Sequence, residues 1–193
     1  MNINGRPLRV CLDPGHGGAD SGAVGQNGLQ EADVVLEVAK ILKGLLTEDN
    51  CHVWLTREKD VTLKLSERTA TAKIHKCDLF LSIHCNAADA KLATGMETLW
   101  GSGQPRSLKF AQKIQMEMVK AFPDHKDRGL RESPSTRYPR SIYVVRNNPC
   151  PSALVELEFI SNSKMEKLLS LKETKEKIAQ ALRIAILDYA ASL

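Results

Sequence analysis

The sequence lacks the features that mark membrane proteins and disulfide-stabilised proteins. None of its apolar runs approaches the roughly 20 residues that cross a bilayer, and residues 1–9 contain no apolar stretch typical of a signal peptide. The five cysteines are odd in number, form no C-x-x-C pair and fall mostly in apolar runs, which indicates buried free thiols. Internal repeats, low-complexity segments and linkers are also missing. We therefore expect one domain that spans residues 1–193.

Charge and composition exclude little beyond disorder. Hydrophobic residues make up 42% of the chain and charged residues 26%, which are ordinary values for a globular protein. The net charge of +4 suits a protein that works near an acidic polymer, although most proteins with this balance bind nothing acidic. We expect no nucleic-acid partner, no membrane span and a monomer. The missing signal peptide fits either a protein kept in a reducing cytoplasm or one whose export segment has been removed.

Apolar runs alternate with helical periodicities along the chain. Strands are predicted at residues 3–12, 51–55, 78–84, 96–100, 142–145 and 153–160. Helices are predicted between them, with Ser66 and Ser107 as N-caps and a capping box of Ser163 and Glu166. Residues 123–141 are basic and interrupted by glycine and proline, which predicts a solvated loop or the wall of a substrate groove. The alternation predicts an α/β fold: a six-stranded, mostly parallel sheet with helices on both faces.

A glycine-rich turn follows the first predicted strand. In the segment LDPGHGG, residues 12–18, Pro14 ends the strand and three glycines leave little side-chain bulk around His16. The spacing matches neither G-x-G-x-x-G nor a P-loop, which argues against a phosphate site. Taken alone, His16 is either a metal ligand or an ordinary turn histidine.

Further candidate residues gather at the same predicted edge of the sheet. His16 and His84 each follow a strand, Glu31 begins the first long helix and Glu156 lies in the last strand. Two imidazoles and a carboxylate, with a fourth position left to water, are a recurrent catalytic zinc arrangement. Glu156 suits a general acid/base, because a glutamate in an apolar strand is costly unless it is paired or functional. The alternative for Glu31 is a favourable interaction with the helix dipole. Cys85 points to the other face from His84 and is interpreted as a packing residue.

Six segments of the chain occur in the order found in one enzyme family. They are LDPGHGG (12–18), LQE (29–31), TR (56–57) with Asp60, Arg68, DLFLSIHCN (78–86) and ALVELEFISN (153–162). By these motifs the sequence resembles the zinc-dependent N-acetylmuramoyl-L-alanine amidases of the amidase_3 type. The resemblance implies one zinc ion (Zn²⁺) held by His16, Glu31 and His84, with Glu156 as the catalytic acid/base. It also implies that the substrate is peptidoglycan, cut between the lactyl group of N-acetylmuramic acid and L-alanine. The expected setting is the cell wall, as a phage endolysin or as the catalytic part of a bacterial autolysin.

One residue departs from the family pattern. Glu158 stands where the family normally has glycine, and in a regular strand it would share a face with Glu156, roughly 6.6 Å away. Either the strand turns so that Glu158 points to solvent, or Glu158 meets a basic partner, for example from the loop at 128–140. No inserted helix follows Glu31, so the site is expected to be open. Two rival functions remain: a zinc peptidase or deacylase that cleaves another amide, and an inactive wall-binding module.

Overall fold

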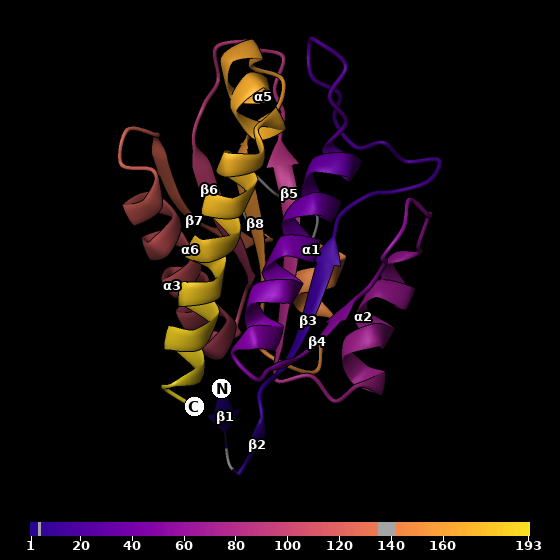
Figure 1. Cartoon of the computed structure of the whole chain (residues 1–193), viewed down its shortest axis with the longest axis vertical. Helices are drawn as coiled ribbons and strands as arrows, with labels where there is room; N and C mark the ends of the chain where they lie inside the picture. Colours follow the sequence, from indigo (N-terminus) through magenta and orange to yellow (C-terminus); the bar gives the residue numbers. More distant parts are fainter. Residues whose placement is uncertain (4, 135–141) are drawn as a thin grey trace.

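The computed structural model describes residues 1–3, 5–134 and 142–193, and a six-stranded sheet is its central feature (Figure 1). The strand order is β4-β3-β5-β8-β6-β7. The strands are β3 (Arg9–Pro14), β4 (His52–Leu55), β5 (Leu79–Asn86), β6 (Met96–Gly101), β7 (Asp127–Ser133) and β8 (Ser152–Phe159). Neighbouring strands are parallel except for β6 and β8, which are antiparallel. The predicted six-stranded, mostly parallel sheet is confirmed.

Helices cover both faces of this sheet, as predicted. One face carries α1 (Glu31–Glu48), α3 (Pro105–Ala121) and α6 (Lys172–Ala190), which lie side by side over the sheet in Figure 1. The other face carries α2 (Leu65–Ile74) and the short α4 (Tyr143–Arg146), while α5 (Ser163–Ser170) precedes α6 at the upper end in Figure 1. A large apolar core fills the first face and a smaller one the second. Within the described residues, none of the helices combines the length and apolarity needed to span a bilayer.

Two segments differ from the prediction in their secondary structure. Residues 127–133, predicted as part of a loop, form β7, which pairs in parallel with β6 at the edge of the sheet. Residues 142–145, predicted as a strand, lie almost entirely in α4, where Val144 and Val145 pack in the smaller core. A four-residue apolar run fits a buried strand and a buried helical turn equally well, so periodicity alone does not separate them. Residues 135–141 of the predicted loop lie outside the described residues.

The N-terminal strand is shorter than predicted. Residues 3–12 do not form one strand, because β1 (Asn2–Ile3) and β2 (Arg6–Pro7) fold into a small antiparallel ribbon around Gly5, which has a φ of 77°. The central strand β3 then begins at Arg9. Glycine suits this tight turn because a positive φ costs it little.

The predicted N-caps also differ from the observed ones. Ser66, Ser107 and Ser163 all lie within the first turn of their helices, because the helices begin earlier, after Lys64, Gln104 and Asn162. The cap of α5 is the side chain of Asn162, which accepts hydrogen bonds from the backbone N–H groups of Lys164 and Met165. No capping box forms between Ser163 and Glu166.

Candidate metal centre

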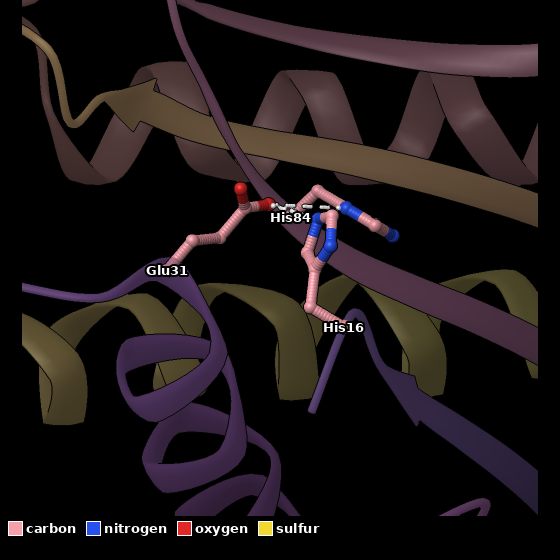
Figure 2. Close-up of side chains that lie close together, drawn as sticks. All are labelled: His16, Glu31 and His84. Atoms are coloured by element: carbon pink, nitrogen blue, oxygen red, sulfur yellow. Dashed lines mark hydrogen bonds and ion pairs between the residues drawn. The ribbon is translucent and has the colours of Figure 1, made fainter. Parts of the chain in front are cut away.

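Three side chains from distant parts of the sequence converge at the carboxyl ends of β3 and β5. His16 lies in the loop after β3, His84 near the end of β5, and Glu31 is the first residue of α1. Glu31 Oε1 lies 3.1 Å from His16 Nε2 and 3.1 Å from His84 Nδ1. Figure 2 shows the carboxylate of Glu31 pointing from α1 toward the two rings. One ligand atom of each residue lies within 4.8 Å of the others, so two nitrogens and one oxygen form a donor set that suits one metal ion.

Two glycines make this convergence sterically feasible. A Cβ at Gly15 would lie 2.3 Å from Cε1 of the His84 ring, and a Cβ at Gly22 would lie 2.7 Å from Glu31 Oε2. Gly22 also has a φ of 65°, which strains any residue with a side chain. The glycines of the loop are therefore required by the close approach of the ligands.

Two buried arginines hold the loop that carries His16. Arg57 donates from Nε to the carbonyl of Pro14 (3.0 Å) and from Nη2 to that of Gly15 (2.7 Å). Arg68 donates from Nη1 to the carbonyl of Pro14 (2.8 Å) and from Nη2 to that of His16 (2.7 Å). In the sequence, both arginines stand out only as parts of family motifs. Their role depends on carbonyl groups brought close by the fold, which no sequence interval reveals.

Charged and titratable side chains contact one another across this site, from Asp20 through His16 and Glu31 to His84. Asp20 Oδ2 lies 2.9 Å from His16 Nδ1, which orients the ring so that Nε2 faces Glu31. Burial lowers the pKa of His16, but the contacts with Glu31 and Asp20 outweigh burial and raise it to about 9. Burial would raise the pKa of Glu31, and the hydrogen bonds from His16 and His84 instead hold it well below its usual value. The metal-free site is thus an ion pair, in which a metal ion would replace the His16 proton.

Glu156 lies beside this cluster, on the neighbouring strand. It pairs with His84 in the register of β5 and β8, so both side chains are on the same face of the sheet. Its Oε2 is buried and has no hydrogen-bond partner among residues 1–3, 5–134 and 142–193. Burial raises the pKa of this carboxyl to about 7, helped by the nearby charge of Glu31 and opposed by that of His84. A carboxyl that titrates near neutral pH can both accept and donate a proton.

Glu158 meets a basic partner, which is the second of the two alternatives expected for it, but this partner is not in the segment given as the example. It is buried rather than exposed to solvent, and its partner is not in the segment 128–140: Oε1 lies 3.1 Å from His125 Nδ1. Oε2 accepts hydrogen bonds from the backbone N–H groups of Gly95 and Phe159, both at 2.8 Å. The cause is an irregularity in the pairing of β5 and β8, which places one extra residue on β8 between Glu156 and Phe159.

A cleft of about 370 Å³ opens beside the three converging residues. His16 and His84 line one end of it. Its walls are formed by the residues around the start of α2 and by α4, with apolar side chains from Leu65 and Tyr143. These two side chains are exposed, at 54% and 38% of their surface. The cluster is therefore reachable by a large molecule lying along the face that carries α2 and α4.

Comparisons with known proteins agree with this geometry. Residues 10–188 match the sequence model of the family Amidase_3, N-acetylmuramoyl-L-alanine amidase. The chain is 38% identical to protein YqiI of Bacillus subtilis (strain 168), with 93% of the chain and 84% of YqiI aligned. It is 35% identical to the N-acetylmuramoyl-L-alanine amidase LytC of the same organism, with 93% of the chain aligned but only 35% of LytC.

A solved structure shows the same fold. The N-acetylmuramoyl-L-alanine amidase of Clostridium difficile 630 superposes with a TM-score of 0.89 at 28% identity, covering 97% of this chain and 98% of that one. The family model spans nearly all of the chain, and the solved structure reproduces the sheet and helices that carry the converging residues. The chain belongs to the Amidase_3 family of N-acetylmuramoyl-L-alanine amidases, enzymes that act on cell-wall peptidoglycan.

Proposed function

We propose that the protein hydrolyses the amide between N-acetylmuramic acid and L-alanine with one zinc ion held by His16, Glu31 and His84. The observation that carries the proposal is the convergence of these three ligand atoms within 4.8 Å, beside a glutamate whose carboxylate has an oxygen without a partner among the described residues. Family membership supports the choice of substrate.

The residues fit zinc better than magnesium or calcium. Two imidazole nitrogens and one carboxylate oxygen are typical of catalytic zinc, whereas magnesium and calcium prefer oxygen ligands alone. Asp20 holds Nδ1 of His16 and so leaves Nε2 to face the ion. When bound, zinc supplies Lewis acidity, which polarises a carbonyl group and makes water a better nucleophile near neutral pH.

In this proposal Glu156 moves the protons of the reaction. Its carboxylate takes a proton from the attacking water as the oxygen bonds to the lactyl carbonyl carbon. The carbon–nitrogen bond then breaks, and Glu156 gives the proton to the nitrogen, which leaves as the amine of L-alanine. The pKa of about 7 suits both halves of this task, because an efficient acid/base titrates near the working pH.

Mass spectrometry of purified peptidoglycan digested by this protein tests the proposal. We expect released stem peptides with free L-alanine amino termini, lost when zinc is chelated and restored when zinc is added back. Glu156→Gln should bind zinc and release none. Cleavage elsewhere in the peptide would favour the zinc peptidase, and no cleavage despite bound zinc would favour the inactive wall-binding module.

A further inference from the structure

A third acidic residue continues the row formed by His84 and Glu156. In the sheet register His84 pairs with Glu156, and Glu156 pairs in turn with Glu97 on β6. Side chains of paired residues stand on the same face of a sheet, so all three lie on the face that carries the candidate metal centre. The row runs from the metal ligands toward β7, at the edge of the sheet.

Glu97 is completely buried and, among the described residues, accepts hydrogen bonds from two guanidinium groups. Its Oε2 accepts hydrogen bonds from Nε of Arg128 (3.2 Å) and from Nε of Arg131 (3.1 Å). Its Oε1 accepts a hydrogen bond from Nδ2 of Asn86 (2.7 Å). We call these four residues the Glu97 cluster. These four residues comprise one carboxylate, two guanidinium groups and one neutral amide. The Glu97 cluster, counted in this way, carries one net positive charge beside the candidate metal centre.

The two arginines are held very differently. Arg128 also donates from Nη1 to the carbonyl of Thr94 (3.4 Å), and its guanidinium lies 4.9 Å from the centre of the Phe159 ring. Arg131 has 33% of its side chain exposed. Within the described residues, Nε is the one nitrogen of the Arg131 side chain that makes a hydrogen bond. Glu97 therefore fixes the direction of Arg131 while both Nη groups keep their donors for a ligand.

The positive charge of the Glu97 cluster suits the peptide side of the substrate better than the glycan side. N-acetylmuramic acid has no free carboxylate once its lactyl group is joined to L-alanine, so the glycan side is neutral. The stem peptide is acidic, because its second residue, D-glutamate, is linked through its side-chain carboxyl and keeps its α-carboxylate. An anionic ligand for Arg131 is thus supplied by the peptide side of the scissile bond.

Distances along the sheet agree with this match. Neighbouring strands lie about 4.8 Å apart, so the β6 strand that carries Glu97 is one spacing beyond Glu156 and β7 is two spacings, about 10 Å. An extended chain advances about 3.5 Å per residue, which puts the second residue roughly 7 Å from the scissile carbonyl. The side chain of Arg131 extends from β7 to Glu97 on β6. It therefore lies between one and two strand spacings from Glu156, which includes the distance of roughly 7 Å.

We propose that Arg131, oriented by Glu97, binds the α-carboxylate of the second stem-peptide residue and makes the enzyme prefer stems in which that group is not amidated. The proposal rests on the amidase function proposed above. A planar guanidinium binds a carboxylate through two parallel hydrogen bonds, and such charge-assisted bonds are stronger than neutral ones. Arg131 acts on affinity and specificity, while Glu156 carries the proton transfers.

The test compares three synthetic substrates that share the N-acetylmuramoyl-L-alanine bond. The first is N-acetylmuramoyl-L-alanyl-γ-D-glutamyl-L-lysine, the second has the α-carboxyl of D-glutamate amidated, and the third has the C-terminal carboxyl amidated instead. We expect the wild-type enzyme to cleave the first and third with kcat/KM about tenfold above the second, mainly through KM. Arg131→Gln should lose this preference while keeping its rate on the second substrate, and Arg131→Lys should be intermediate.

Two controls keep the result specific. Lys120→Gln removes a positive charge from α3 on the opposite face and should leave all three rates unchanged. The amidated substrate serves as an internal control for folding, since damage to the site would slow its cleavage too. Equal loss on all substrates, or a preference that follows the C-terminal carboxyl, would overturn the assignment. Failure of the wild-type enzyme to cleave any of the three would instead refute the amidase function.

Discussion

Glu156 and Glu158 are two residues apart on β8 and have opposite surroundings. Glu156 lies on the face of the candidate metal centre, with a buried carboxylate oxygen that has no partner among the described residues and a pKa raised by burial to about 7. Glu158 lies among residues of α5, α6 and the segment after α3, where His125 and the backbone N–H groups of Gly95 and Phe159 surround its carboxylate. Within the described residues, one glutamate has a carboxylate oxygen without a hydrogen-bond partner, and the other has partners for both oxygens.

The two glutamates differ in how many hydrogen-bond partners their carboxylates have. Both residues sit in an apolar strand, and both lie near a histidine. Glu158 has enough partners to offset the cost of burying its charge, whereas Glu156 does not. A carboxylate without hydrogen-bond partners beside a metal site can still exchange protons. A carboxylate whose oxygens both accept hydrogen bonds instead stabilises the fold. The following predictions test this contrast.

The largest expected effect is on turnover. Glu156→Gln removes the proton acceptor and should lower kcat by about a thousandfold, because positioned acid/base catalysis typically contributes 10²–10⁴. Glu158→Gln should change kcat by less than about threefold, since its carboxylate touches neither the metal ligands nor Glu156. The measurement is the release rate of L-alanine amino termini from a soluble muramoyl peptide. If the Glu158 variant were the inactive one, the roles assigned here would be reversed.

A similar contrast is expected for zinc. His84→Ala removes a ligand and should weaken zinc binding at least about a hundredfold, since even residues behind the ligands contribute 10- to 100-fold. His125→Ala is the matched control, because His125 also lies 3.1 Å from a glutamate but has no second imidazole beside it in the described structure. Its zinc affinity should match the wild type in a competition titration with a chelating dye. Equal loss in both variants would contradict the ligand set.

Stability should change in opposite directions for the two glutamates. At pH 8 the buried Glu156 carboxylate is ionised at a cost, because its folded pKa of about 7 exceeds the unfolded value. Glu156→Gln should therefore stabilise the metal-free protein by about 3 kcal/mol at pH 8, with the gain fading as pH falls from 7 to below 4.5. Glu158→Gln should destabilise it by about 1–2 kcal/mol through weakened hydrogen bonds. Urea unfolding of chelator-treated protein measures both, and a stabilised Glu158 variant would refute the contrast.

The last prediction is a pH dependence of zinc binding. Zinc requires neutral His16, whose pKa in the metal-free protein is about 9. Affinity should thus fall about tenfold per pH unit as pH decreases from 9 to 7, with one proton released per ion bound. Calorimetry in buffers of different ionisation enthalpy counts this proton. Asp20→Asn lowers the pKa of His16 and should reduce the count, whereas a pH-independent affinity in the wild type would show that His16 is neutral before zinc binds.

Motifs in the sequence predicted more of the site than of the sheet's edge. His16, Glu31 and His84 lie together as expected, because parallel strands bring their carboxyl ends to one edge whatever the exact element boundaries. The predicted number of strands in the large sheet was right, but one of the six was misplaced: residues 142–145 are helical and residues 127–133 form the edge strand. Edge strands carry a weak apolar pattern, since only part of their surface is buried.

Contacts between residues that are distant along the chain could not be predicted from the sequence. The partner of Glu158 was expected from the segment 128–140, and it is His125 instead. Arg128 and Arg131, expected in a loop, lie on β7 and bind Glu97. Each of these partners depends on an irregularity in strand pairing, one between β5 and β8 and one between β6 and β7. A shift of one residue exchanges the two faces of a strand, and no local pattern reveals it.

The sequence by itself determined the α/β class, the family and which residues converge at the candidate metal centre, because these follow from local periodicity and from motifs that are contiguous in the chain. Tertiary structure alone decided which glutamate of β8 faces the candidate metal centre, which arginines hold the His16 loop and which arginine of β7 keeps part of its side chain exposed. Those outcomes depend on register and on desolvation, and both are set only when strands far apart in sequence lie side by side.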